Sequence, residues 1–154
     1  MERLLAIKML NKTFTKNGYS NIVVDNALSS SNLTSQQKKL CSILYYGVLE
    51  RKITLDYIVC RYSKKPLDKL DTSVLNILRC GIYQILYLDS IPDSASVNES
   101  VNLAKKLRLS SASGFINAIL RGFIRDGKTY PLPKDVLNSL SIQSVSYTHL
   151  TLPT

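Results

Sequence analysis

Apolar residues recur every three or four positions through most of this chain, which is the spacing of one face of an α-helix. The first segment, residues 2–16, shows the pattern clearly, with an apolar stripe at Leu4, Ile7, Leu10 and Phe14. Its opposite face carries a ridge of lysines at every fourth position: Lys8, Lys12 and Lys16. The pattern therefore predicts an amphipathic helix with one apolar and one basic side.

Three more helices are predicted before residue 66. Ser20 can cap a short second helix, and either Thr34 or Ser35 can cap a third. We expect a bend near Arg51, followed by a fourth helix with Ile53, Tyr57 and Ile58 on one side. Proline at position 66 ends this part of the chain.

The segment that follows residue 71 is apolar around nearly its whole circumference. Asp71 or Thr72 can cap it, and only a narrow polar strip interrupts the apolar surface, at Asn76, Arg79 and Tyr83. A helix of this kind is buried on most sides by its neighbours. We therefore expect it to be the central helix of the domain.

Two further amphipathic helices are predicted downstream. Asp93 or Ser94 can cap the first, and an Asp-Gly pair at 126–127 is typical of the end of the second. The second also repeats small residues at Gly114, Ala118 and Gly122, a strip on which another helix could pack closely. Strand signals are weak throughout. The predicted fold is an all-α bundle of about six or seven helices.

The charge balance indicates the kind of partner that the protein binds. Twenty Lys and Arg against eleven Asp and Glu give a net charge of +9 in a chain of 154 residues. Such a surplus favours a polyanionic partner, with nucleic acid ahead of an acidic membrane surface, although a protein that is merely basic remains the alternative. The candidate RNA-binding residues are Lys8, Lys12, Lys16, Arg51, Lys52, Lys105, Lys106, Arg108, Asn117, Arg121 and Arg125.

The sequence offers no recognisable catalytic or metal-binding set. Its only histidine, His149, lies near the C-terminus, and no glycine-rich phosphate-binding motif occurs. Three cysteines at wide spacing, without a C-x-x-C pair, are expected to be reduced, buried structural thiols: Cys41, Cys60 and Cys80. Neither a signal peptide nor a membrane-spanning stretch is recognisable, so we expect a soluble, cytoplasmic protein.

Several segments resemble, in order and without large gaps, the N-terminal domain of bacterial ribosomal RNA cytosine-C5 methyltransferases of the RsmB (Sun) type: "GYSNIVVDNAL", "YYGVLERKITLD", "PLDKLDTSVLNILRCGIYQILYLDSIPDSASVNESVNLAKK" and "SGFINAILRGF". That domain has the all-helical NusB fold, which it shares with the transcription antitermination factor NusB. The later motifs are similar in both branches. The segments "YSNIVVDNAL" and "YGVLERKITLD" look like the methyltransferase branch.

The resemblance implies a role in binding and positioning ribosomal RNA for methylation of a cytosine at carbon 5, with the lysine ridge of the first helix as a region of contact. In that family the catalytic cysteines and the S-adenosylmethionine-binding domain lie downstream, so no catalytic or cofactor-binding residue is assigned to this chain. The alternative is a stand-alone NusB-type antitermination factor, which binds RNA and a ribosomal-protein partner.

Three regions are expected on this basis. Residues 1–127 form the helical RNA-binding domain, and residues 128–144 begin a linker towards a methyltransferase domain that the chain lacks. The last ten residues, 145–154, read "VSYTHLTLPT" and resemble the translation of a sequencing-library adaptor. We expect this tail to be foreign and disordered, with His149 neither a ligand nor a base.

Overall fold

The computed structural model describes residues 1–16 and 21–130, except for the side chains of residues 16 and 21–23. The predicted cap at Ser20, most of the predicted linker and the whole predicted tail lie outside the described residues. Within them the chain forms seven α-helices and no strand, which confirms the all-α prediction. The helices are α1 (Glu2–Lys16), α2 (Asn21–Ser29), α3 (Ser35–Glu50), α4 (Lys52–Tyr62), α5 (Thr72–Tyr87), α6 (Asp93–Lys106) and α7 (Ser113–Arg125), with 3₁₀ turns η1 (Leu67–Lys69) and η2 (Ser110–Ala112).

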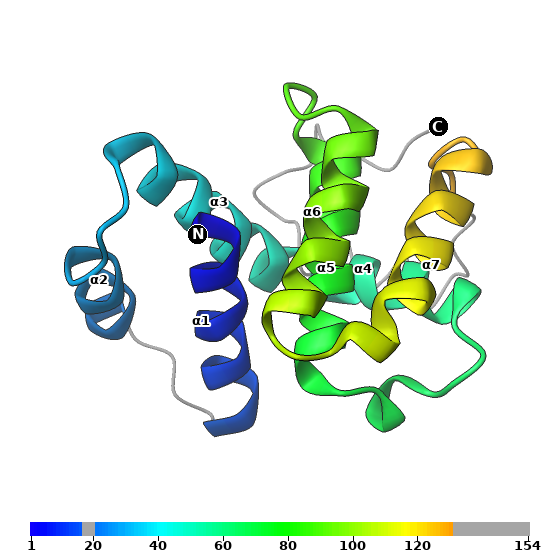
Figure 1. Ribbon diagram of the computed structural model, residues 1–154, viewed down its shortest axis with the longest axis horizontal. Coiled ribbons are helices and arrows are strands. Elements are labelled where there is room, and N and C mark those ends of the chain that lie inside the picture. Colours follow the sequence, from blue (N-terminus) through cyan, green and yellow to red (C-terminus); the bar gives the residue numbers. More distant parts are fainter. Residues whose placement is uncertain (17–20, 131–154) are drawn as a thin grey trace.

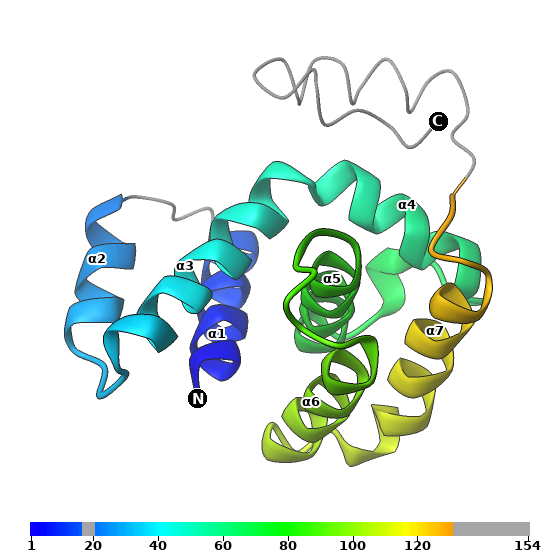
Figure 2. The same ribbon diagram turned by 90° about the horizontal axis from the view of Figure 1, so that it is seen from above.

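Helix α5 is the central element of the fold, as its apolar circumference predicts. It contacts α1, α3, α4, α6 and α7, and Figure 2 shows it enclosed by these neighbours. Helix α2 lies at one edge of the molecule, beside α1 and α3 (Figure 1). The core therefore forms around α5, and the N-terminal helices extend the bundle on one side.

A small residue allows two helices to approach α5 closely. A Cβ atom added at Gly81 would lie 2.9 Å from Ser100 Oγ on α6 and 3.0 Å from Leu120 Cδ1 on α7. The side chains around it are buried. Helices α6 and α7 thus pack on α5 at a distance that a larger residue would increase.

The polar strip of α5 is internal rather than solvated. Arg79 donates from Nε to Asp56 Oδ1 at 2.6 Å and from Nη2 to Asp56 Oδ2 at 3.1 Å, which joins α5 to α4. Its Nη1 donates to Asn76 Oδ1 at 2.8 Å, and Asn76 donates to Asn11 Oδ1 of α1 at 2.7 Å. This network satisfies the buried polar groups and holds three helices in register.

Several of the predicted helix limits are confirmed. Thr34 caps α3 and forms a reciprocal capping box with Gln37. The chain bends at Arg51, which separates α3 from α4, and Asp71 caps α5 by accepting from two backbone N–H groups. At the far end of the bundle, α7 closes on Gly127, whose φ of 81° is the left-handed conformation that glycine adopts readily.

Three expectations, one about a helix cap and two about burial, are wrong. Pro92, without a side-chain cap, occupies the N-cap position of α6, so Asp93 is the first helical residue instead. Ile53 is 38% exposed because the buried face of α4 is rotated onto Leu55, Ile58 and Val59. Cys60, on the outer side of the same helix, is exposed, whereas the other two cysteines are buried as expected.

The small-residue strip of α7 is used at one position only. Gly122 is buried, and a Cβ added there would lie 3.3 Å from the ring of Tyr62 on α4. Gly114 has nothing within 4 Å of such a Cβ, and Ala118 is exposed. Helix α4 therefore crosses α7 at its C-terminal end rather than running along the strip.

Candidate nucleic-acid interface

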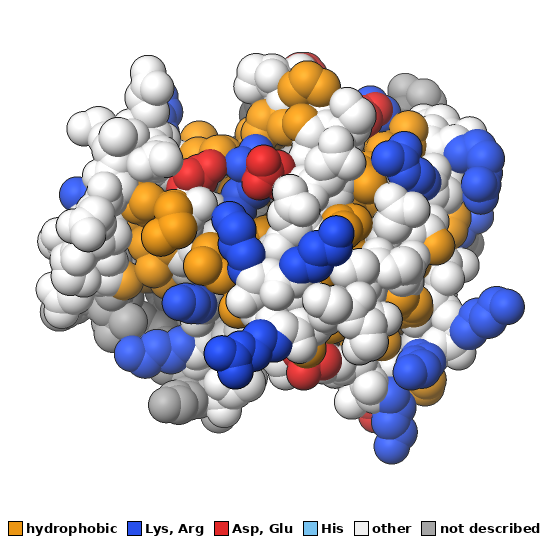
Figure 3. Space-filling model, in the orientation of Figure 1, with side chains coloured by type: hydrophobic (Ala, Val, Ile, Leu, Met, Phe, Trp, Pro, Cys, Tyr) orange, Lys and Arg blue, Asp and Glu red, His pale blue; other side chains and the backbone are white. Residues whose placement is uncertain are grey.

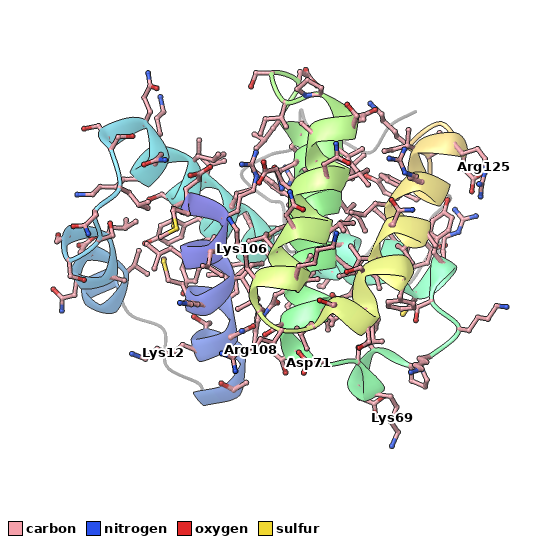
Figure 4. The ribbon with its side chains drawn as sticks, viewed as in Figure 1. Lys12, Lys69, Asp71, Lys106, Arg108 and Arg125 are labelled. Carbon is pink, nitrogen blue, oxygen red and sulfur yellow. The ribbon has the colours of Figure 1, made fainter. Side chains whose placement is uncertain are left out.

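Helices α1 and α6 bring basic residues from distant parts of the sequence onto one side of the molecule. Figure 4 shows Lys12, Lys106 and Arg108 on the same side of the molecule, and Figure 3 shows Lys and Arg side chains gathered over these two helices. Lys8 lies one turn from Lys12, and all of these side chains are exposed. We name the following set the α1–α6 basic patch: Lys8, Lys12, Lys105, Lys106 and Arg108.

Contacts to α5 fix the α1 half of this patch. Arg3 donates from Nε to Gln84 Oε1 at 2.9 Å, near the start of α1. Further along the helix, Asn11 donates from Nδ2 to Ser73 Oγ at 2.8 Å and accepts from Asn76. Because the inner face of α1 is held by these bonds and by its buried apolar residues, Lys8 and Lys12 point outward.

The α6 half of the patch ends in an unusual backbone turn. Arg108 has a φ of 60°, and its N–H donates to the carbonyl of Lys105 at 3.1 Å. The next N–H, of Leu109, donates to the carbonyl of Ala104 at 2.7 Å. These two bonds form a Schellman motif, in which the left-handed position is usually glycine. Here an arginine occupies it, so the turn carries charge at the expense of backbone strain.

The predicted RNA-binding residues of α7 lie apart from this patch. Arg121 donates from Nε to Asn117 Oδ1 at 3.0 Å on α7, and Arg125 lies at the opposite end of the molecule from Lys12 (Figure 4). Lys16 belongs to α1, but its side chain is outside the described residues. The α7 residues thus form a second, separate basic cluster.

Two predicted residues at the α3–α4 bend are engaged within the protein. The Arg51 guanidinium lies 5.0 Å from the ring centroid of Tyr87. Lys52 forms an ion pair with Asp56 at 3.2 Å and lies 5.8 Å from the ring centroid of Phe14. These contacts support the bend and make this pair a weaker candidate for phosphate binding than the exposed patch.

Sequence reasoning found the basic residues but missed how they combine. In the sequence, the lysines of α1 form one ridge, and Lys105, Lys106 and Arg108 lie together at the end of another helix. Their proximity depends on both helices packing on α5, which brings together segments about ninety residues apart. No pattern within either segment signals this arrangement.

The two buried cysteines do not form a nucleophilic site. Burial raises the pKa of the Cys41 thiol to about 11 and that of Cys80 to about 12. Both thiols therefore stay protonated near neutral pH, where only the thiolate is an effective nucleophile. Among the residues that the structure describes, no group of three or more His, Cys, Asp or Glu side chains is placed to hold a metal ion. The described helices also include none that is long and apolar enough to cross a membrane.

The architecture is that of an all-helical bundle with a basic patch across its first and sixth helices. A model of the NusB family matches residues 1–125. The chain belongs to the NusB family, and the resemblance seen in the sequence motifs is confirmed at this level.

The relatives come from both branches of the family. The chain is 35% identical over 125 residues to "Probable ribosomal RNA small subunit methyltransferase B" of Bacillus subtilis and 34% identical over 123 residues to the protein of the same name in Synechocystis, covering 81% and 80% of this chain. It spans only 28% of the length of each of these two proteins. It is also 34% identical over 120 residues to "Transcription antitermination protein NusB" of Dictyoglomus thermophilum, covering 77% of this chain and 81% of that protein.

Proposed function

We propose that this chain is the RNA-binding domain of an S-adenosylmethionine-dependent ribosomal RNA cytosine-C5 methyltransferase, and that it acts in the cytoplasm. The observation that carries the proposal is the α1–α6 basic patch, where the exposed Lys12, Lys106 and Arg108 lie on the same side of the molecule, with Lys8 and Lys105 close to them in the sequence. The names of the Bacillus and Synechocystis relatives support the methyltransferase branch, as do the branch-specific motifs near residues 19–28 and 46–56.

In this proposal the domain binds and positions RNA and does not catalyse the methyl transfer. Exposed lysines and arginines neutralise phosphates and release condensed counterions, which makes the affinity depend on salt. S-adenosylmethionine would supply the methyl group in a separate domain. The described residues do not fit that cofactor, because four of their five glycines lie inside helices and none forms a glycine-rich turn. No step through the cofactor is therefore assigned to this chain.

An antitermination function is the second candidate. It is favoured by the Dictyoglomus relative, of which the alignment covers 81%. In that case the same patch would bind nascent RNA together with a ribosomal-protein partner. The reading frame of the natural gene beyond codon 143 separates the two functions. A continuing frame that encodes a Rossmann-like domain with a Pro-Cys motif is expected, and a natural stop codon there would refute the methyltransferase proposal.

RNA binding by the patch is tested with a structured fragment of small-subunit ribosomal RNA, titrated at several salt concentrations. The double variant Lys12→Gln/Lys106→Gln should weaken binding and lower the slope of log affinity against log salt by about 1.4–1.8, from about 0.7–0.9 per lost phosphate contact. Lys69→Gln is the matched control, because Lys69 is exposed on η1, away from the patch in Figure 4. An unchanged slope in the double variant would indicate that the RNA binds another face of the protein. The variant Arg121→Gln/Arg125→Gln would then test the cluster on α7.

A further inference from the structure

A groove with an apolar floor runs along α1 on the side facing α2. Its main cavity has a volume of about 360 Å³, and the described apolar residues that line it are Leu5, Met9, Val24, Ala27 and Tyr45. A second cavity of about 300 Å³ adjoins it and shares Leu5, Lys8 and Ser30. Figure 3 shows hydrophobic side chains at the surface between α2 and α1, next to the basic residues.

The charge on the rim of this groove has one sign. Lys8 and Lys12 line the main cavity, and the described lining residues include no carboxylate. The same two lysines form the α1 half of the basic patch, so the groove and the patch are continuous. A ligand that suits both has an apolar part and an adjacent negative charge.

Polar groups at the cavity wall could hold the edge of such a ligand. Asn26 is exposed on α2 and offers both an amide donor and a carbonyl acceptor. The hydroxyls of Thr13 and Tyr45 lie 2.6 Å apart and are already paired with each other. The hydroxyls on the α1 and α3 side of the cavity are therefore paired within the protein, and the side chain that offers hydrogen bonds to a ligand is Asn26 on the α2 side.

We propose that the α1–α2 groove receives one unpaired base of the bound RNA, while Lys8 and Lys12 hold the flanking phosphates. This proposal rests on the proposed RNA binding and adds a preference for single-stranded or looped RNA. Unpaired bases are the parts of RNA that proteins bury, because their apolar faces and edges are accessible there. The cavity volume falls at the lower end of the range of about 300–1,000 Å³ for small-ligand sites.

The test compares two RNAs on three proteins. The RNAs are a short unpaired oligonucleotide of mixed sequence and the same strand with abasic sites, which keeps every phosphate and removes the bases. Ala27→Leu fills the groove from α2, and Ser29→Leu is the matched control, because Ser29 is exposed on the same helix and does not line the cavity. The unchanged protein should bind the oligonucleotide about tenfold more tightly than its abasic form, as expected for burial of one base.

The groove variant decides where the base lies. Ala27→Leu should reduce the tenfold preference to nearly one while leaving the affinity for abasic RNA unchanged, and Ser29→Leu should keep the preference. If the preference survives in Ala27→Leu, the groove does not hold the base, and an apolar partner segment becomes its more suitable occupant. Equal binding of both RNAs by the unchanged protein would overturn the proposal but leave RNA binding intact. Absence of binding to any RNA at low salt would instead overturn the proposed function.

A measurement without substitutions guards against misfolding of the variant. An oligonucleotide with 2-aminopurine at its unpaired position should change its fluorescence when the unchanged protein binds, because a buried base leaves water and its neighbouring bases. The same label placed in a fully paired duplex should change little. Equal changes in both would contradict insertion of a single base.

Discussion

Replacing Arg108 by glycine should make the protein more stable and a weaker RNA binder. The residue lies in the left-handed position of the Schellman motif that ends α6, with a φ of 60°. The equivalent position after α7 is occupied by Gly127, with a φ of 81° and the same two backbone hydrogen bonds, to the carbonyls of Ile124 and Phe123. The two helices thus end in the same motif, one with its usual glycine and one with a cation.

The magnitude follows from two opposing terms. The left-handed conformation costs a residue with a Cβ about 1–2 kcal/mol. Glycine also has more conformational freedom in the unfolded chain, which reduces the gain in stability by about 0.5–1 kcal/mol. Arg108→Gly should therefore raise the free energy of unfolding by about 0.5–1 kcal/mol, or the melting temperature by about 1–4 °C for a chain of this size. The lost charge should at the same time lower the salt slope of RNA binding by about 0.7–0.9.

Two further variants separate strain from charge. Arg108→Gln removes the charge but keeps a Cβ in the left-handed conformation, so it should weaken RNA binding without stabilising the protein. Gly127→Ala introduces the same strain after α7 and should lower the free energy of unfolding by about 1 kcal/mol. Urea unfolding followed by circular dichroism measures both effects. If Arg108→Gly unfolds at a lower urea concentration with the slope m unchanged, the strain argument is wrong.

Three further experiments test the packing of the bundle. Asp56→Ala leaves the almost fully buried Arg79 guanidinium without its carboxylate partner and should lower the free energy of unfolding by about 3–5 kcal/mol. Arg79→Met should lower it less, because Asp56 keeps its ion pair with Lys52 and some contact with solvent. Urea unfolding of both variants checks this order, and the reverse order would contradict it. Gly81→Ala should destabilise by about 1–3 kcal/mol through overpacking, whereas Gly114→Ala, on an open helix surface, should stabilise by about 0.5–1 kcal/mol. At pH 8 a thiol reagent should label one cysteine quickly, the exposed Cys60, and Cys60→Ser should abolish that phase; fast labelling of all three thiols would contradict the burial of the other two.

Local signals predicted the helices and several of their ends. The capping box at Thr34, the cap at Asp71 and the glycine after α7 depend on residues a few positions apart, so they can be recognised in a linear sequence. The end of α6 has the same two backbone hydrogen bonds as that of α7, but arginine there gave no signal. Glycine is recognised because it favours the left-handed conformation, and arginine adopts it only when tertiary structure compensates for the strain.

The orientation of individual side chains was harder to predict. Ile53 fits an apolar stripe but is partly exposed, because the bend at Arg51 rotates α4 onto a different set of residues. Asn76 and Arg79 form a polar strip on the sequence, yet they are buried, since Asn11 and Asp56 approach from two other helices. Periodicity identifies a face of a helix, and the neighbouring helices decide whether that face meets solvent.

The sequence by itself determined that this protein is an all-helical bundle with a central fifth helix and a strong positive charge. Those properties arise from apolar spacing, capping residues and composition, which act locally or sum over the chain. Only the tertiary structure decided that α1 and α6 share one basic face and that an apolar groove lies beside it. Both depend on helices distant in sequence packing against α5, and that packing is set by the shapes of the buried side chains rather than by any single segment.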